Sequence, residues 1–91
     1  MTYFEWDPFK NMTNVRRQGI DFGKASEAFQ DPKRKIVMDS RHSGLEERFY
    51  CIGMVRGKVC MVRFIYRGDK IRIFGAGYWR KGREYYEKTN H

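Results

Sequence analysis

Three arginines in the second half of the chain, Arg48, Arg63 and Arg72, carry the side-chain type that phosphate chemistry needs. A guanidinium group is always charged, and its planar fork of N–H donors matches the oxygens of a phosphate. Fixed cations also stabilise the negative charge that builds up on a phosphodiester as it is cleaved. The same side chains can instead pack across strands or pair with Glu46 or Glu47. We favour phosphate binding and catalysis because all three are expected on one face of a sheet.

Cleavage of a phosphodiester also requires groups that move protons. Glu47 precedes Arg48 at a predicted strand start and is a candidate base, although strand alternation directs it to the opposite face unless the chain bends there. Tyr78 follows the last predicted strand and is a candidate proton donor or a platform for a nucleobase. His42 lies in a polar loop and is an alternative, because histidine in general titrates near neutral pH.

Aromatic and basic side chains near these candidates are typical of a surface that binds single-stranded nucleic acid. Tyr50 and Phe74 share the strands with the arginines and can stack with unpaired bases or be covered by a protein segment. Arg80, Lys81 and Arg83 follow the last strand and can bind a phosphate backbone. They can also form a solvated helix face.

The elements that must position these residues lie in residues 46–76, which are rich in β-branched and aromatic side chains. Two short turn sequences, Arg56-Gly57 and Gly68-Asp69, interrupt this segment. The pattern predicts three antiparallel strands joined by two tight hairpins.

The register of these strands follows if each turn has two central residues. Val55 then pairs with Lys58, and Arg67 pairs with Lys70. Because side chains alternate and paired residues share a face, one face is mostly apolar. The other face carries Arg48, Tyr50, Ile52, Met61, Arg63, Ile65, Arg72 and Phe74, with Phe74 opposite Arg63.

Two amphipathic helices are predicted before this sheet. The first begins at Asp7-Pro8, where Asp is a helix N-cap and Pro fits the first helical position, and it ends at Gly19. The second begins at Asp21 and ends at Asp31-Pro32. Their apolar side chains recur at helical spacing and are expected to cover one face of the sheet: Phe9, Met12, Val15, Phe22, Ala25 and Phe29.

The remaining elements are short. Residues 3–6 and 36–38 are strand candidates, and a C-terminal helix is predicted from about Tyr78. Gly82 inside that helix suits a close approach to another element. Cys51 and Cys60 fall within predicted strands and are expected to be buried thiols, since no CxxC spacing favours a disulfide or a metal site.

The composition is that of a globular chain with an excess of positive charge. Its 91 residues predict a single domain over residues 1–91, and 41% of them are hydrophobic. The net charge is +8, and the excess lies entirely after residue 31. This patch indicates a polyanionic partner, most simply nucleic acid, with a solubilising surface as the alternative. No apolar run approaches the roughly 18 residues of a membrane span, so a cytoplasmic protein without membrane contact is expected.

One combined pattern extends from about residue 3 to residue 87. It consists of Phe4-Glu5-Trp6-Asp7, Lys10, Asn14, Gly19, Phe22, Ala25, Phe29, Asp31-Pro32, Glu46-Glu47-Arg48-Phe49, Ile52-Gly53 and Arg72-Ile73. This pattern resembles the BrnT family of bacterial toxins. The resemblance implies an α+β, RelE-like fold, in which two N-terminal helices pack on a small antiparallel β-sheet and a C-terminal helix follows.

The resemblance also implies a function. It implies a metal-independent endoribonuclease toxin of a type II toxin–antitoxin pair, which needs no cofactor and blocks translation by cutting mRNA, with or without the ribosome. The implied partner is a BrnA-like ribbon-helix-helix antitoxin, through which alone operator DNA is contacted. The alternative is a non-catalytic module of the same fold that binds nucleic acid or the antitoxin.

The chain departs from the family pattern at three places. Many members carry His where this chain has Gln18, and Ser-Ala-Arg where it has Gly75-Ala76-Gly77. Residues 78–82 also differ from the commoner version, which is rich in Lys and Arg. The glycines remove a hydroxyl and a guanidinium near the end of the predicted site, and this keeps the non-catalytic alternative open.

Overall fold

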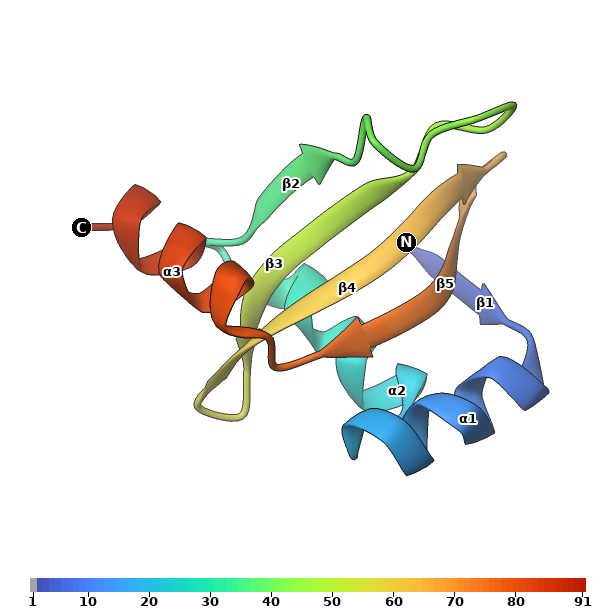
Figure 1. Ribbon diagram of the computed structural model, residues 1–91, viewed down its shortest axis with the longest axis horizontal. Coiled ribbons are helices and arrows are strands. Elements are labelled where there is room, and N and C mark those ends of the chain that lie inside the picture. Colours follow the sequence, from blue (N-terminus) through green and yellow to red (C-terminus); the bar gives the residue numbers. More distant parts are fainter. Residues whose placement is uncertain (1) are drawn as a thin grey trace.

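The computed structural model describes residues 2–91 and contains a five-stranded sheet with the strand order β1-β5-β4-β3-β2 (Figure 1). The strands are β1 (Tyr3–Trp6), β2 (Lys35–Met38), β3 (Phe49–Val55), β4 (Lys58–Arg67) and β5 (Lys70–Gly77). The helices are α1 (Pro8–Gln18), α2 (Phe22–Ala25) and α3 (Arg80–Thr89), and a 3₁₀ helix, η1 (Ser26–Gln30), directly follows α2. No helix within residues 2–91 has the length and apolar character to cross a membrane.

The two predicted hairpins are confirmed. Val55 pairs with Lys58, and the second hairpin likewise has the predicted pairing at its turn. Arg56 and Gly57 have φ angles of 49° and 86°, as a two-residue turn with positive φ at both positions requires. Local turn chemistry therefore determines where β3 turns into β4.

A β-bulge in β5 makes one detail of the predicted register wrong. Arg63 pairs with Gly75 and Phe64 pairs with Ile73, so Phe74 is an extra residue between two ladder positions. The bulge leaves both Phe74 and Gly75 on the face that carries Arg63, where they line one hollow. Strict alternation of side chains cannot place both residues on one face.

The predicted RelE-like architecture is wrong in its sheet. The protein is α+β, but its sheet is mixed, because β1 pairs with β5 in parallel, with Phe4 beside Ile71. Four of the five strands follow α1 and α2 in the chain. Phe4 and Trp6 pack against the hydrophobic core, and this burial holds the N-terminal strand at the edge beside β5.

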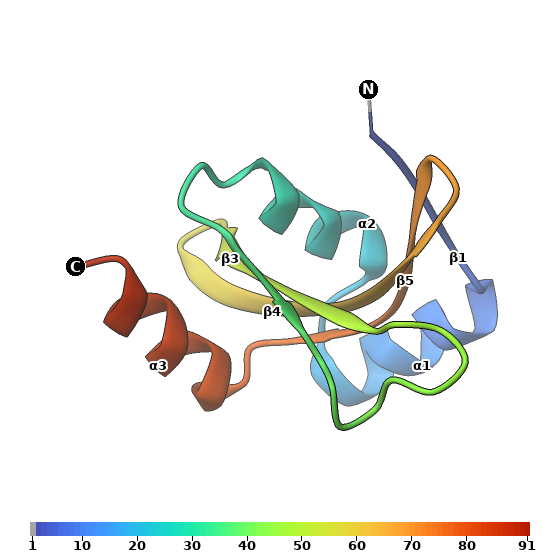
Figure 2. The same cartoon turned by 90° about the horizontal axis from the view of Figure 1, so that it is seen from above.

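The predicted packing of the two N-terminal helices on one face is also wrong. Figure 2 shows α2 and η1 above the sheet, whereas α1 and α3 lie below it. The second predicted helix is a short α-helix that continues as η1, and its Phe22, Ala25 and Ala28 are completely buried. One face of the sheet is therefore covered by α2 and η1, and the other faces the space between α1 and α3.

Helix α1 docks through polar side chains. Asn14 Nδ2 donates hydrogen bonds to the carbonyl oxygens of Ile20 (2.9 Å) and Ala76 (3.0 Å), and Asn14 Oδ1 accepts one from the Ala76 N–H (3.2 Å). Asn11 Oδ1 accepts from the N–H of Phe22 at 2.7 Å. These bonds provide partners for backbone groups at the end of β5 and at the start of α2, which would otherwise lack them.

The apolar side of α1 consequently points to solvent. Phe9 is 77% exposed, and Met12 and Val15 are exposed as well. The prediction that these three side chains cover the sheet is wrong. Asn11 and Asn14, on another side of the helix, make the contacts of α1 with the rest of the protein.

The predicted helix ends are confirmed. Asp7 caps α1 by accepting a hydrogen bond from the N–H of Phe9 at 2.8 Å, and Gly19 ends it with φ of 72°. Asp21 caps α2 by accepting from the N–H of Lys24 at 2.7 Å. Boundaries that depend on capping chemistry are thus readable from sequence, whereas the side on which a helix docks is not.

The hydrophobic core lies between the covered face of the sheet and α2–η1. A side chain at Gly53 would lie 2.5 Å from the carbonyl oxygen of Ala28, so β3 and η1 approach each other closely. Cys51 and Cys60 are free and buried, as predicted, and burial raises the pKa of each thiol to about 12. Both thiols are therefore protonated at neutral pH.

Helix α3 begins at Arg80, two residues after the predicted start. A Cβ on Gly82 would lie 3.0 Å from the sulfur of Met61, so the predicted close approach is that of α3 to β4. Tyr86 donates a hydrogen bond to Asp31 Oδ2 at 2.6 Å. These contacts fix α3 at the border of the uncovered face.

Candidate functional site

Figure 1 shows the sheet between α1 and α3. The face of the sheet in this region is hollowed into a groove. Neighbouring hollows along this face share lining residues and therefore form one continuous surface. The groove is lined mainly by Lys10, Arg17, Arg48, Tyr50, Met61, Arg63, Phe74, Trp79 and Lys81. The hollow next to α1 measures about 410 Å³, which lies within the range of ligand-binding sites.

Arg63 occupies the middle of the groove. It pairs with Tyr50 on β3 and Gly75 on β5, and its guanidinium carbon lies 5.0 Å from the centre of the Phe74 ring. Its Nε is buried and has no hydrogen-bond partner within residues 2–91. A side chain at Gly75 would crowd Arg63, because its Cβ would lie 3.2 Å from the Arg63 Cδ. Arg63 forms no ion pair within residues 2–91 and lines the hollow next to α1, so its charge is available to an anion in the groove.

The other two predicted arginines lie on the same face but differ in pairing. The guanidinium carbon of Arg48 lies 5.2 Å from the centre of the Phe74 ring, and Arg48 forms no ion pair within residues 2–91. Arg72 donates to Glu5 at 3.0 Å, so its charge already has a partner. The structure therefore brings the three arginines together, with Arg48 and Arg63 the more available for a phosphate.

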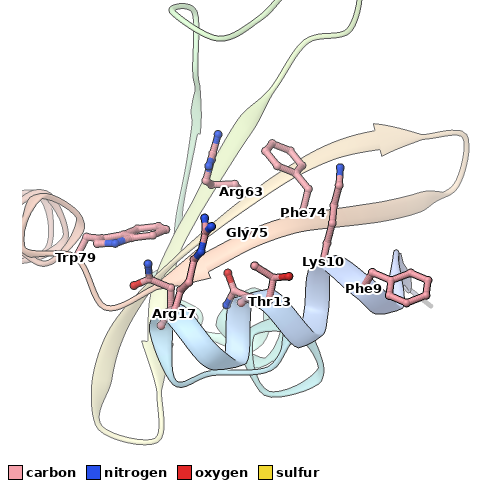
Figure 3. A pocket seen from close by; sticks show the side chains of 10 residues that line it. Phe9, Lys10, Thr13, Arg17, Arg63, Phe74, Gly75 and Trp79 are labelled. Atoms are coloured by element: carbon pink, nitrogen blue, oxygen red, sulfur yellow. The ribbon is translucent and has the colours of Figure 1, made fainter.

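Helix α1 adds two cations that the sequence analysis missed. Figure 3 shows Lys10 and Arg17 projecting from α1 on the side of Arg63, whereas the Phe9 ring borders the hollow but is directed away from Arg63. A spacing of seven residues places them on one side of a helix, which is visible in the sequence. Only the docking through Asn14 shows that this side borders the groove. Together these cations give the groove a positive field that attracts a phosphate backbone.

Trp79 lies against the end of β5. A Cβ on Gly77 would lie 2.7 Å from the Trp79 indole and 3.1 Å from Oε1 of Gln18, so glycine is required for the indole to lie there. Gln18, Gly77 and the segment containing Trp79 are positions at which the chain departs from the BrnT pattern, and the structure brings them together. An indole provides a flat surface on which a nucleobase can stack.

The predicted residues at the C-terminal end of the chain do not all reach the groove. Lys81 lines it. Tyr78 and Arg83 instead line a hollow beside the β3–β4 turn, and burial raises the pKa of Tyr78. Arg80 is exposed in the first turn of α3. Of these four predicted residues, the structure therefore brings Lys81 to the groove that contains Arg63.

The loop between β2 and β3 holds two candidate proton-transfer residues. Glu47 is exposed and lines none of the hollows that form the groove. His42 lines the same hollow as Arg63, and its Nδ1 lies 2.8 Å from Asp39 Oδ2. No group of three His, Cys, Asp or Glu side chains suited to a metal ion is found in residues 2–91.

These features define a class of protein. An uncovered sheet face that carries cations and aromatic rings is typical of proteins that bind single-stranded nucleic acid. The family model described as the ribonuclease toxin BrnT of a type II toxin–antitoxin system matches residues 6–82. The chain therefore belongs to the BrnT family of ribonuclease toxins, which confirms the resemblance of its residue pattern, and membership implies an RNA substrate and an antitoxin partner. No curated protein matches the chain.

Proposed function

We propose that this chain is a metal-independent endoribonuclease that binds single-stranded mRNA in the groove and thereby blocks translation in the cytoplasm. The observation that carries the proposal is the state of Arg63, which lies in the middle of the groove and forms no ion pair within residues 2–91. Lys10 and Arg17 flank it and suit the neighbouring phosphates, and Trp79 suits a base. A phosphate bound to Arg63 would supply the opposite charge that the guanidinium lacks within residues 2–91.

Cleavage without a metal ion uses the 2′-hydroxyl beside the scissile phosphate as the nucleophile. Its oxygen attacks phosphorus, a 2′,3′-cyclic phosphate forms, and the 5′-oxygen of the next nucleotide leaves with a proton. Negative charge builds up on the phosphate oxygens during this step, and Arg63 and Arg48 supply fixed positive charge beside it. We assign Arg72, which is paired with Glu5, to the RNA backbone next to the scissile phosphate.

The test incubates the full chain, freed of its partner, with a single-stranded RNA in EDTA. We expect products with 2′,3′-cyclic phosphate ends, and a loss of about 10²–10³ in rate for Arg63→Ala, as when one transition-state donor is removed. Arg83→Ala removes the same charge outside the groove and should cleave at the unaltered rate. Added to a translation extract, the unaltered chain should stop synthesis and Arg63→Ala should not. RNA binding without cleavage contradicts the proposal and supports the non-catalytic alternative.

The proposed antitoxin is a BrnA-like ribbon-helix-helix protein that carries the contact with operator DNA. The exposed apolar side of α1 supports a protein contact, because patches of this kind are typical of interaction surfaces. Helix α1 has basic but no acidic residues, so an amphipathic segment with acidic side chains suits it. Phe9→Ala combined with Met12→Ala should weaken antitoxin binding, measured by titration calorimetry. Leu45→Ala, which removes an exposed side chain from the β2–β3 loop, should not.

A further inference from the structure

Asp39, in the loop after β2, is the only charged side chain that is buried within residues 2–91, with 8% of its surface exposed. A buried carboxylate needs partners. Its Oδ2 lies 2.8 Å from Nδ1 of His42. Its backbone is also fixed, because its N–H donates to the carbonyl of Arg48 at 2.7 Å and its carbonyl accepts from the Ser43 hydroxyl at 2.8 Å. The loop therefore holds this carboxylate in one place.

The contact with Asp39 determines which nitrogen of His42 is available. A carboxylate accepts hydrogen bonds, so Nδ1 carries the proton, and in the neutral ring Nε2 is left with its lone pair. His42 is 56% exposed, although its partner is buried. The pair thus presents an oriented imidazole to the outside of the molecule.

The imidazole lies beside the groove. A hollow of about 330 Å³ is lined by His42 together with Tyr50, Arg63, Trp79 and Lys81. This hollow shares Arg63 and Trp79 with the one next to α1, so His42 and the α1 cations border a single continuous surface. A phosphate on Arg63 would have an imidazole on one side and a cationic helix on the other.

We propose that His42 is the general base of the groove and that Asp39 is its positioning residue, an inference that rests on the proposed ribonuclease function. Nε2 of His42 takes the proton of the 2′-hydroxyl as the 2′-oxygen forms its bond to phosphorus. The bond from phosphorus to the 5′-oxygen breaks, and that oxygen takes a proton from water. The imidazolium, stabilised by Asp39, then returns its proton to solvent.

The groups around His42 suit this role. Besides Asp39, the charged or titratable side chains that face it are Arg41 from its own loop, Tyr50 from β3, Arg63 from β4, and Lys81 and Tyr85 from α3. Burial acts to raise the pKa of Asp39, but the interactions with His42 and Tyr50 outweigh it, so this pKa is lowered and the carboxylate stays ionised. Burial and then Asp39 raise the pKa of Tyr50, which stays protonated.

The test compares His42→Gln with His91→Gln, which changes the only other histidine of the chain, at its exposed end. Single-turnover cleavage of a short single-stranded RNA in EDTA should slow by about 10²–10⁴ for His42→Gln, as expected for a lost general base. The affinity for the same RNA should change less than about twofold, since no phosphate contact is removed. His91→Gln should match the unaltered chain in both measurements.

Two further measurements separate a base from a structural residue. The cleavage rate should rise with pH to a plateau, as expected of a reaction that needs a general base, and His42→Gln should lack this rise. Added imidazole should partly restore cleavage by His42→Ala. Asp39→Asn should slow cleavage less than His42→Gln does and shift the pH profile.

The outcomes distinguish this inference from the proposed function. If the unaltered chain cleaves RNA and His42→Gln cleaves it at the same rate, His42 is not the general base, but the proposed ribonuclease function still holds. A His42→Gln variant that is folded but has lost RNA affinity also overturns it, in favour of a binding role. Absence of cleavage by the unaltered chain overturns both. If His42→Gln does not fold, rescue of His42→Ala by imidazole decides, and failure of rescue overturns the base.

Discussion

The two helical segments at the start of the chain resemble each other in sequence and dock in opposite ways. Each begins with an aspartate that caps the helix, and each carries apolar side chains at helical spacing. Phe22 of α2 is completely buried in the core, whereas Phe9 of α1 is 77% exposed. The amphipathic pattern therefore predicts the buried side of α2 correctly, whereas the side of α1 that it predicts to be buried is exposed.

The difference shows that backbone hydrogen bonding can outweigh apolar spacing in the docking of a helix. Below the sheet, α1 meets backbone N–H and C=O groups of Ala76 and Ile20, and Asn14 supplies both a donor and an acceptor for them. Above the sheet, η1 approaches β3 closely at Gly53, and Phe22, Ala25 and Ala28 of α2 and η1 are completely buried in the core. This arrangement leaves the groove open and turns Lys10 toward it.

Phe22→Ala should have the largest effect on the free energy of unfolding. The ring is fully buried, so its loss leaves a cavity in the core, and we expect destabilisation of about 3–5 kcal/mol. Urea unfolding followed by circular dichroism measures it. A destabilisation near zero would mean that the Phe22 ring does not contribute to the packing of α2 on the covered face of the sheet.

Asn14→Ala should have the next largest effect. The change removes three hydrogen bonds and leaves partly buried backbone groups of Ile20 and Ala76 without partners, for a loss of about 1–3 kcal/mol in the same assay. Thr13→Ala is the control, because Thr13 is exposed on the same helix. Equal stability of the two variants would refute polar docking of α1.

Asp31→Asn should have a smaller effect that depends on pH. Asp31 ends η1 and accepts hydrogen bonds from the Met54 N–H (2.7 Å) and the Tyr86 hydroxyl (2.6 Å). Burial acts to raise its pKa, but these bonds and one from the Lys33 N–H outweigh it, so the folded-state pKa is lowered. We expect a loss of about 1 kcal/mol at neutral pH.

The sign of the pH dependence follows from that lowered pKa. The stabilisation by Asp31 is fully present above the ordinary carboxyl pKa of 3.8 and is lost as pH falls through the lower folded-state value. The stability difference between the unaltered chain and Asp31→Asn should therefore close below about pH 4. Asp69→Asn, in the exposed β4–β5 turn, serves as control. If the stability difference between the two proteins persisted to pH 2, the ionised Asp31 carboxylate would not be the source of the stabilisation.

Phe9→Ala should have the smallest effect. Its ring lies mostly in solvent, so we expect a change in unfolding free energy within about 0.5 kcal/mol, measured beside Phe22→Ala. A loss as large as that of Phe22→Ala would mean that the apolar side of α1 is buried, which would remove the contrast between the two segments.

For the candidate site, sequence reasoning predicted that Arg48, Arg63 and Arg72 share a face, because hairpin turns fix register and register fixes faces. It could not predict that Glu5 pairs with Arg72, since β1 joins the sheet from the far end of the chain. It placed Tyr78 near the site, but the structure turns this residue toward the β3–β4 hairpin.

The sequence by itself determined the features that depend on neighbours along the chain. The caps at Asp7 and Asp21, the stop at Gly19 and the hairpins follow from chemistry within a few residues. Only the tertiary structure decided which side of α1 faces the sheet, because Asn14 and its partner Ala76 lie 62 positions apart. The convergence of His42 with Arg63 in one hollow has the same origin, since residues from different elements meet only after the sheet has assembled.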